Sequence, residues 1–279
     1  MESPRDSPRD SSRDSSRDSL SPLDSLRREW LALLVEYRAI AIIRAASVTD
    51  GLAMAQAAAA GGFRLIEITW TNNAAPAEMT RLVQRALPHC VIGAGSVLTL
   101  DDLNNALKAG ARFCFTPHTD CLLIRSAQAQ GIPLIAGAMT PTEVFTAWRA
   151  GAASVKVFPI AALGNDTYVR SLLGPLGAIP LVPTGGVTSE SAPALLEAGA
   201  IAVGLSTALF PKDEVERQEW GAIEARSRYL LALLSKASAS DWALSLATKL
   251  KGFNKQTVDH AELESVQRFS QSRSRSHRA

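Results

Sequence analysis

The feature that most constrains the fold is a recurring passage in which a helix-like stretch ends at a glycine and an apolar run follows within one or two residues. Its five instances are Ala60-Gly-Gly-Phe63, Ala109-Gly-Ala-Arg112, Gln130-Gly-Ile-Pro133, Ala150-Gly-Ala-Ala153 and Ala198-Gly-Ala-Ile201. Glycine adopts the left-handed conformation that closes a helix, after which the chain can turn into a strand. The runs that follow are continuously apolar, as expected of parallel strands with helices on both faces. The pattern therefore predicts alternating helices and parallel strands.

Eight apolar runs predict eight strands, at Ala39–Arg44, Leu65–Trp70, Val91–Gly95, Phe113–Pro117, Pro133–Ala136, Ser154–Phe158, Pro180–Thr184 and Ala200–Leu205. Successive runs lie about 20–30 residues apart, which leaves room for a crossover helix each time. Eight strand–helix units in roughly 190 residues are typical of a compact TIM (β/α)8 barrel. A doubly wound open sheet is the alternative, but it would seldom need eight regular units without a glycine-rich dinucleotide turn. We also expect an extra helix at Leu23–Tyr37 and an amphipathic helix at about Glu214–Ser235.

The composition divides the chain into three parts. Residues 1–20 read as a disordered tail rich in Ser, Arg and Asp, residues 21–236 as the barrel domain, and residues 237–279 as an extension that ends in a disordered Ser/Arg-rich segment. A net charge of +2 implies no strong attraction to polyanions, so a nucleic-acid partner is not expected. The C-terminal arginines leave open a contact with RNA or an anionic surface.

The three cysteines and the distribution of apolar residues bear on the compartment. Cys90, Cys114 and Cys121 lack the spacing of metal ligands, and their odd number argues against a disulfide framework. No apolar stretch reaches membrane-spanning length. We therefore expect a cytoplasmic protein that has no metal site and no membrane association.

Polar residues collect where the predicted strands end. They are Arg44, Glu67, Ser96, Thr116-Pro117-His118, Lys156, Thr184-Gly185-Gly186 and Ser206. In TIM barrels the carboxyl ends of the strands carry the active site. The ring of polar residues therefore predicts a site at that face of the barrel.

Lys156 is a single lysine inside the apolar run Ser154-Val-Lys-Val-Phe-Pro159. A buried ammonium is costly unless it is paired or loses its proton, and a lysine without its proton is a nucleophile suited to a Schiff base with a carbonyl substrate. The alternative is a lysine near a strand end whose ammonium extends to solvent along its aliphatic stem.

Glu67 is a second charge inside an apolar strand. By alternation Leu65, Glu67 and Thr69 share one face, which in a barrel can point inward toward Lys156. One interpretation is a general acid/base whose pKa is raised by burial, and the other is a buried ion pair between Glu67 and Lys156. Trp70, at the end of the same run, either contacts a ligand or packs in the core.

Two glycine-containing turns favour phosphate binding. Pro183-Thr-Gly-Gly-Val-Thr188 follows the seventh predicted strand and Gly204-Leu-Ser-Thr207 follows the eighth. These are the phosphate-binding positions of such barrels, where glycines let backbone N–H groups approach an anion and hydroxyl groups add donors.

From about Ala39 to Pro211 the chain resembles the class I 2-keto-3-deoxy-6-phosphogluconate (KDPG) aldolases, a group that includes 4-hydroxy-2-oxoglutarate (KHG) aldolase activity and 2-keto-3-deoxy-6-phosphogalactonate aldolases. The matching motifs are Ile66-Glu-Ile-Thr69, Ile92-Gly-Ala-Gly-Ser-Val97, Thr116-Pro-His118, Val155-Lys-Val-Phe-Pro159, Pro183-Thr-Gly-Gly-Val187 and Gly204-Leu-Ser206. The resemblance implies a keto-acid or sugar-acid phosphate substrate, a homotrimer, and no metal or organic cofactor.

The resemblance also implies a role for each matching residue. Lys156 would form the Schiff base and Glu67 would be the acid/base. The residues expected to contact substrate are Arg44, Ser96 near the pyruvate carboxylate, Thr184, Gly185, Gly186 and Ser206 at the phosphate, and Pro117 and Phe158 as walls of the pocket.

Thr71 is the main departure from the family pattern. Many KDPG aldolases have an arginine at this position, which grips the pyruvyl carboxylate, whereas the galactonate-type relatives have an amide side chain there. Losing a charge-assisted contact should weaken binding of the keto acid by about 1.5–3 kcal/mol.

The expected activity is cleavage of KDPG to pyruvate and glyceraldehyde 3-phosphate. Cleavage of KHG, cleavage of the galactonate analogue, a non-covalent phosphate-binding barrel and a scaffold protein remain as alternatives.

Overall fold

The computed structural model describes residues 21–71, 73–177 and 179–237. Eight strands form one parallel sheet: β1 (Ala39–Ile43), β2 (Leu65–Thr69), β3 (Val91–Gly95), β4 (Cys114–Phe115), β5 (Leu134–Ala138), β6 (Ser154–Val157), β7 (Leu181–Pro183) and β8 (Val203–Leu205). The predicted disordered tail 1–20 and the predicted C-terminal extension 237–279 lie outside the described residues except for Ala237.

The helices surround this sheet. They are α1 (Pro22–Tyr37), α2 (Val48–Ala60), α3 (Pro76–Ala86), α4 (Leu100–Lys108), α5 (Cys121–Ala129), α6 (Pro141–Ala150), α7 (Ile160–Leu163), α8 (Asp166–Leu176), α9 (Ser191–Glu197), α10 (Lys212–Glu216) and α11 (Trp220–Lys236). None of the helices in the described part of the chain is long and apolar enough to cross a membrane.

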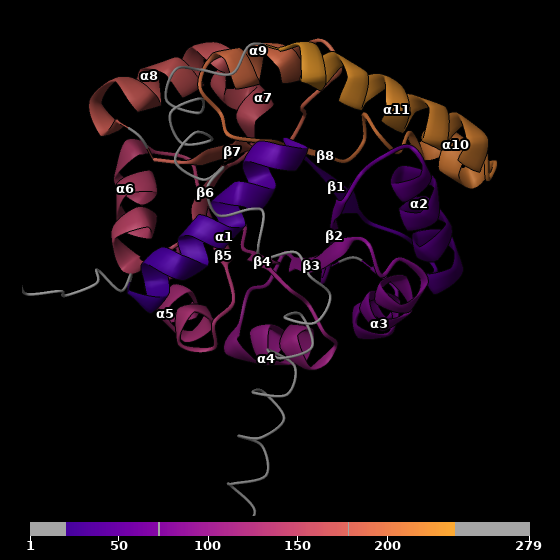
Figure 1. Ribbon diagram of the computed structural model, residues 1–279, viewed down its shortest axis with the longest axis horizontal. Coiled ribbons are helices and arrows are strands. Elements are labelled where there is room, and N and C mark those ends of the chain that lie inside the picture. The colour runs from indigo at the N-terminus through magenta and orange to yellow at the C-terminus, as the bar shows by residue number, and fades with distance from the viewer. Residues whose placement is uncertain (1–20, 72, 178, 238–279) are drawn as a thin grey trace, which may run out of the picture.

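The strands run in the order β7-β6-β5-β4-β3-β2-β1-β8, and the Ile201 N–H donates to the Leu181 carbonyl (3.0 Å) where the two outer strands meet. Figure 1 shows the resulting ring of strands, with helices α2 to α11 outside it. The predicted (β/α)8 barrel is therefore confirmed, and the open doubly wound sheet is not formed.

The glycines at the helix ends behave as predicted. In all five passages a glycine has positive φ, namely Gly62, Gly110, Gly131, Gly151 and Gly199. At the other end of the helices, Thr99 and Thr140 form capping boxes that begin α4 and α6. These local signals determine where several helices of the barrel begin and end.

The fourth and eighth strands are shortened most relative to the prediction, and the ends of the other strands lie within two residues of it. The fourth strand was expected over Phe113–Pro117 but is limited to Cys114–Phe115, because the Thr116 hydroxyl donates to the His118 carbonyl and turns the chain. The eighth was expected to begin at Ala200 but begins at Val203, because the Ala200 N–H still donates to a carbonyl of α9.

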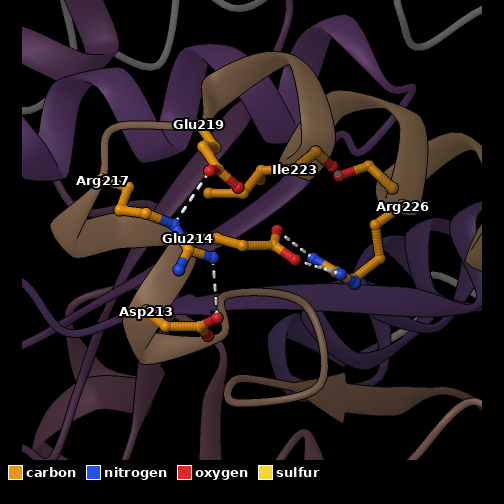
Figure 2. A network of polar contacts seen from close by, with 7 residues as sticks. Asp213, Glu214, Arg217, Glu219, Ile223 and Arg226 are labelled. Atoms are coloured by element: carbon orange, nitrogen blue, oxygen red, sulfur yellow. Dashed lines mark hydrogen bonds and ion pairs between the residues drawn. The ribbon is translucent and has the colours of Figure 1, made fainter.

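The helix predicted at Glu214–Ser235 is wrong as a single element. It is split into α10 and α11 by Gln218, which has a φ of 56°. Arg217 bonds both Asp213 (2.9 Å) and Glu219 (2.8 Å) across this break, and Glu214 pairs with Arg226 of α11, as Figure 2 shows. The charges thus link the short α10 to the long α11, two helices that a purely hydrophobic pattern joins into one.

The end of the barrel at which the strands begin is closed by α1, which lies across the ring in Figure 1. Trp30 of α1 is 1% exposed, and its indole N–H donates to the Ser154 hydroxyl (2.9 Å). Its ring packs on Phe113 inside the barrel, with the ring centroids 5.0 Å apart. Arg27 of α1 stacks on Trp148 and donates to two carbonyls, that of Trp148 in the last turn of α6 and that of Ala152 just after it. The extra helix is therefore the floor of the barrel.

Candidate active site

Lys156 lies inside the barrel near the middle of β6. On this strand Val155 and Val157 belong to the outer core between sheet and helices, whereas Ser154 faces inward to Trp30. Alternation therefore turns the Lys156 side chain inward as well. It is 7% exposed, so the alternative in which its ammonium extends to solvent is not what the structure shows.

Aromatic rings surround the Lys156 amine. Its Nζ lies 5.0 Å from the centre of the Phe158 ring and 5.6 Å from that of Phe115. Phe115 contacts Phe113 edge to face, so aromatic side chains fill the lumen from the floor to the amine. Phe158 thus lies beside the amine, at the position where the resemblance implies a wall of the pocket.

Glu67 faces the same lumen from β2 and is 1% exposed. Its carboxylate occupies the space above Gly95 of β3, where any Cβ atom would overlap it. Among the described residues, no ion pair joins Glu67 to Lys156 and no hydrogen-bond partner lies within reach of Glu67 Oε2. The buried ion pair, one of the two interpretations of the sequence, is therefore not formed.

Burial raises the pKa of Glu67, and the nearby positive charges of Lys156 and Arg44 oppose this only in part. A carboxyl group with a raised pKa can both give and take a proton near neutral pH. The direction agrees with the prediction of a general acid/base at this position.

Arg44 and Thr71 lie at the rim, after β1 and β2. Arg44 is exposed and Thr71 is half-buried. Asn73 was not predicted as a site residue. Its side chain accepts from the Ala45 N–H (3.1 Å) and donates to the Thr69 carbonyl (2.9 Å). This amide joins the two loops that carry Arg44 and Thr71.

Ser96 and Pro117 follow the neighbouring strands β3 and β4. Ser96 is half-buried and has a left-handed φ of 57°, an unusual conformation for a residue with a side chain. Pro117 is half-buried, and its backbone packs directly against Gly137 of β5. Both residues therefore lie on the rim between Glu67 and Lys156.

The residues predicted to bind phosphate follow β7 and β8. Thr184 is buried and packs against Gly204, while Gly185 and Gly186 have φ values of 84° and 80°. Ser206 is half-buried at the end of β8. The turn after β7 therefore lies beside the strand that carries Lys156, and Ser206 follows β8, the next strand around the barrel.

Several buried side-chain oxygens at the carboxyl ends of the strands have no hydrogen-bond partner among the described residues. Buried side-chain oxygens without a partner among the described residues include Glu67 Oε2, Thr69 Oγ1 and Thr184 Oγ1. An unpartnered buried polar group costs about 1–3 kcal/mol, so its presence needs a reason. Thr69 was not predicted as a site residue, although the alternation that identified Glu67 also places Thr69 on the inner face.

Other parts of the molecule offer less. Trp70 packs against the outer core, and its buried indole N–H has no hydrogen-bond partner among the described residues, so both of its predicted roles stay predictions. No group of three or more His, Cys, Asp or Glu side chains in the described ranges is arranged to hold a metal ion. Two hollows on the outer surface, of about 340 Å³ near Arg125 and about 250 Å³ near Trp220, contain none of the predicted residues.

Comparison with known proteins agrees with this geometry. A model of the KDPG and KHG aldolase family matches residues 32–226. The 2-dehydro-3-deoxy-phosphogluconate aldolase of Pseudomonas aeruginosa is 35% identical over 197 residues, which cover 70% of this chain and 89% of that protein. The 2-dehydro-3-deoxy-6-phosphogalactonate aldolase of Escherichia coli is 31% identical over 172 residues, 61% of this chain and 83% of that protein.

Among solved structures, the KDPG aldolase of Legionella pneumophila, with pyruvate captured as a covalent carbinolamine, is 26% identical. It has a TM-score of 0.67 and covers 72% of this chain and 97% of its own. The family model alone spans well over half of the sequence, and it includes every residue of the ring described above. The chain therefore belongs to the KDPG and KHG aldolase family and is an aldolase, a carbon–carbon lyase.

Proposed function

We propose that the protein is a class I aldolase that cleaves KDPG through a Schiff base on Lys156. The observation that carries this proposal is the burial of Lys156 and Glu67 in one lumen without a direct ion pair between them. An amine that is neither exposed nor neutralised by a carboxylate is suited to attack a carbonyl group. A carboxyl group with a raised pKa nearby is suited to move the protons that the reaction requires.

The proposed reaction proceeds in balanced steps. Lys156 Nζ adds to the C2 carbonyl, and the carbinolamine loses water to give an iminium ion. Glu67 takes the proton of the C4 hydroxyl, the C3–C4 bond breaks, and its electron pair forms the enamine as glyceraldehyde 3-phosphate leaves. Glu67 then returns the proton to C3, and water hydrolyses the iminium to pyruvate and the free amine. The covalent stage replaces an unstabilised carbanion by an enamine.

The phosphorylated substrate is favoured by the retained turns after β7 and β8. Gly185 and Gly186 expose their backbone, and Ser206 adds a hydroxyl beside them. Binding a phosphate far from the reacting carbons would orient the sugar acid over Lys156. Arg44 at the rim would supply positive charge for the keto-acid carboxylate or the phosphate.

Two other substrates are second candidates. Thr71 favours the galactonate analogue, since the sequence resemblance gives those relatives an uncharged side chain at this position. KHG needs no phosphate site and would use the same lysine and glutamate. Lyase assays on all three substrates at matched concentrations would rank them by kcat/KM.

The decisive experiment is borohydride reduction in the presence of pyruvate, followed by peptide mass spectrometry. We expect a reduced pyruvyl adduct on Lys156. Its absence, under conditions that label another class I aldolase, would exclude the covalent mechanism and leave a non-covalent phosphate-binding barrel or a scaffold. An adduct would exclude both of those alternatives.

A homotrimer is part of the proposal. Exposed apolar side chains lie on consecutive segments on one side of the barrel, from the loop after β3 to α6: Leu98, Leu100, Leu122, Met139 and Phe145. Such side chains are enriched where protein surfaces meet. Light scattering during size-exclusion chromatography should give about three times the 29.7 kDa chain mass.

A further inference from the structure

The four buried threonines of the described residues fall into two pairs. Thr80 donates to the Pro76 carbonyl (2.8 Å), and Thr116 donates to the His118 carbonyl (2.6 Å). Thr69 and Thr184 are each 1% exposed, and neither hydroxyl has a partner among the described residues. The hydroxyls of the first pair therefore contribute hydrogen bonds to the fold, whereas those of Thr69 and Thr184 do not.

Thr184 belongs to the turn already assigned to phosphate, whereas Thr69 has no role in the proposed mechanism. Thr69 lies on the inner face of β2, two residues beyond Glu67 toward the mouth of the barrel. Its partner in the neighbouring strand is Gly95, and the Glu67 carboxylate occupies the space above Gly95. The hydroxyl and the carboxylate are therefore neighbours, yet no hydrogen bond joins them.

We propose that Thr69 is a further substrate-contacting residue, whose hydroxyl donates to the substrate oxygen that exchanges a proton with Glu67. The proposal rests on the proposed aldolase function and adds a residue to its reacting centre. During C–C cleavage that oxygen passes from a hydroxyl toward a carbonyl and carries negative charge on the way. A donor already aimed at it stabilises that charge without reorganisation, while the carboxylate stays free to take the proton.

The chemistry of threonine provides a direct test, because valine has the same shape without the hydroxyl. Thr69→Val removes an unsatisfied polar group, so the free protein should become more stable, with Tm higher by about 2–4 °C. The kcat for cleavage should fall by about 10- to 100-fold, with little change in KM. Thr69→Ser keeps the hydroxyl and should keep kcat within about threefold of the wild type.

Thr80→Val is the matched control, because this buried threonine makes its hydrogen bond outside the site. It should lower Tm and leave kcat unchanged. A structural role for Thr69 predicts the same result for Thr69→Val, namely a lower Tm with normal turnover, and that result would overturn the proposal. A wild-type kcat in Thr69→Val, whatever its Tm, would overturn it as well.

The failure of the underlying function would look different. If the wild-type protein forms no borohydride-trapped pyruvyl adduct, the aldolase mechanism and the Thr69 contact are both wrong. If the wild type is labelled on Lys156 and Thr69→Val turns over normally, only the Thr69 contact is wrong. Thr69→Ala provides a second measurement, since it should match the kcat of the valine variant.

Discussion

Polar side chains are hydrogen-bonded at one end of the barrel, whereas buried oxygens lack a partner among the described residues at the other end. At the floor, the Ser154 hydroxyl accepts from Trp30, and the Arg27 guanidinium donates to two carbonyls at and just after the end of α6. At the mouth, buried oxygens of Glu67 and Thr69 have no partner among the described residues. Ser154 and Lys156 are only two residues apart on β6, so a single strand takes part in both ends.

This difference indicates that the floor of the barrel contributes to stability and that the mouth is the end suited to the proposed reaction. A satisfied buried group contributes to the fold, whereas an unsatisfied one costs free energy that only a ligand can recover. TIM barrels commonly separate these roles between the two faces. Substitutions at the floor should therefore lower stability and leave activity unchanged, whereas substitutions at the mouth should lower activity and leave stability unchanged or raise it.

The largest effect should come from Lys156→Met, which keeps an unbranched side chain but removes the nucleophile. We expect the pyruvyl adduct to disappear and kcat/KM to fall by on the order of 10⁴-fold or more, with Tm unchanged or higher. Lys108→Met, on the exposed surface of α4, is the control and should label and turn over normally. An adduct of normal yield in Lys156→Met would place the Schiff base elsewhere.

Glu67→Gln should lower kcat by about 10²–10⁴-fold, because an amide cannot carry the proton. It should also raise Tm at pH 8. Burial raises the pKa of Glu67, so its contribution to stability is fully present below the unfolded pKa of about 4.3 and is lost as pH rises through the folded pKa. The gain from glutamine should consequently vanish near pH 4. Thermal melts across this range measure it.

Glu143→Gln is the control of opposite sign. Backbone N–H groups of Met139 and Thr140 hold the pKa of Glu143 below its usual value. Its stabilisation is therefore present above the unfolded pKa and lost as pH falls, so the substitution should lower Tm at pH 8. If Glu67→Gln lowers Tm at pH 8 as Glu143→Gln does, the electrostatic interpretation of Glu67 fails.

Trp30→Ala tests the floor. Removing this buried ring should lower the free energy of unfolding by about 3–5 kcal/mol in urea titrations. The kcat/KM of the folded protein should stay within about twofold of the wild type. Trp30→Phe keeps a ring but loses the bond to Ser154, and should cost only about 1 kcal/mol. A loss of activity that precedes unfolding would show that the two ends are coupled.

Gly95→Ala should lower kcat by about 10- to 100-fold. The added Cβ overlaps the position of the Glu67 carboxylate, which must move while the barrel stays folded. Gly174→Ala in α8 meets no neighbouring atom and is the matched control, with normal kcat. Full activity of Gly95→Ala would mean that the placement of the carboxylate is not critical.

Much of the architecture was predictable because it depends on local signals. Glycines closed the helices, and continuous apolar runs marked the strands, so the number and order of elements followed. The break at Gln218 was not predictable, because the apolar face continues across it and only the pairing of Arg217 with two acids shows the bend. The role of α1 was also missed, since nothing in its own sequence says that Trp30 reaches Ser154.

The site was predictable where a residue type conflicts with its surroundings. Lys156 and Glu67 are charges in apolar runs, and their pattern identified them. Thr69 is an ordinary strand residue, and its unsatisfied hydroxyl becomes visible only once every partner in space is known. Asn73 likewise makes contacts, to Ala45 and Thr69, that depend on how two separate loops meet.

The closed floor has a kinetic consequence. With α1 beneath the lumen, the described part of the barrel has its entrance at one end only, and both fragments of a cleaved substrate must leave by the same route. In the proposed mechanism the aldehyde would lie nearer the exit, while the three-carbon fragment would stay attached to Lys156 until hydrolysis. Release is then ordered, so added pyruvate should compete with substrate for the free enzyme, whereas the aldehyde should inhibit without competing.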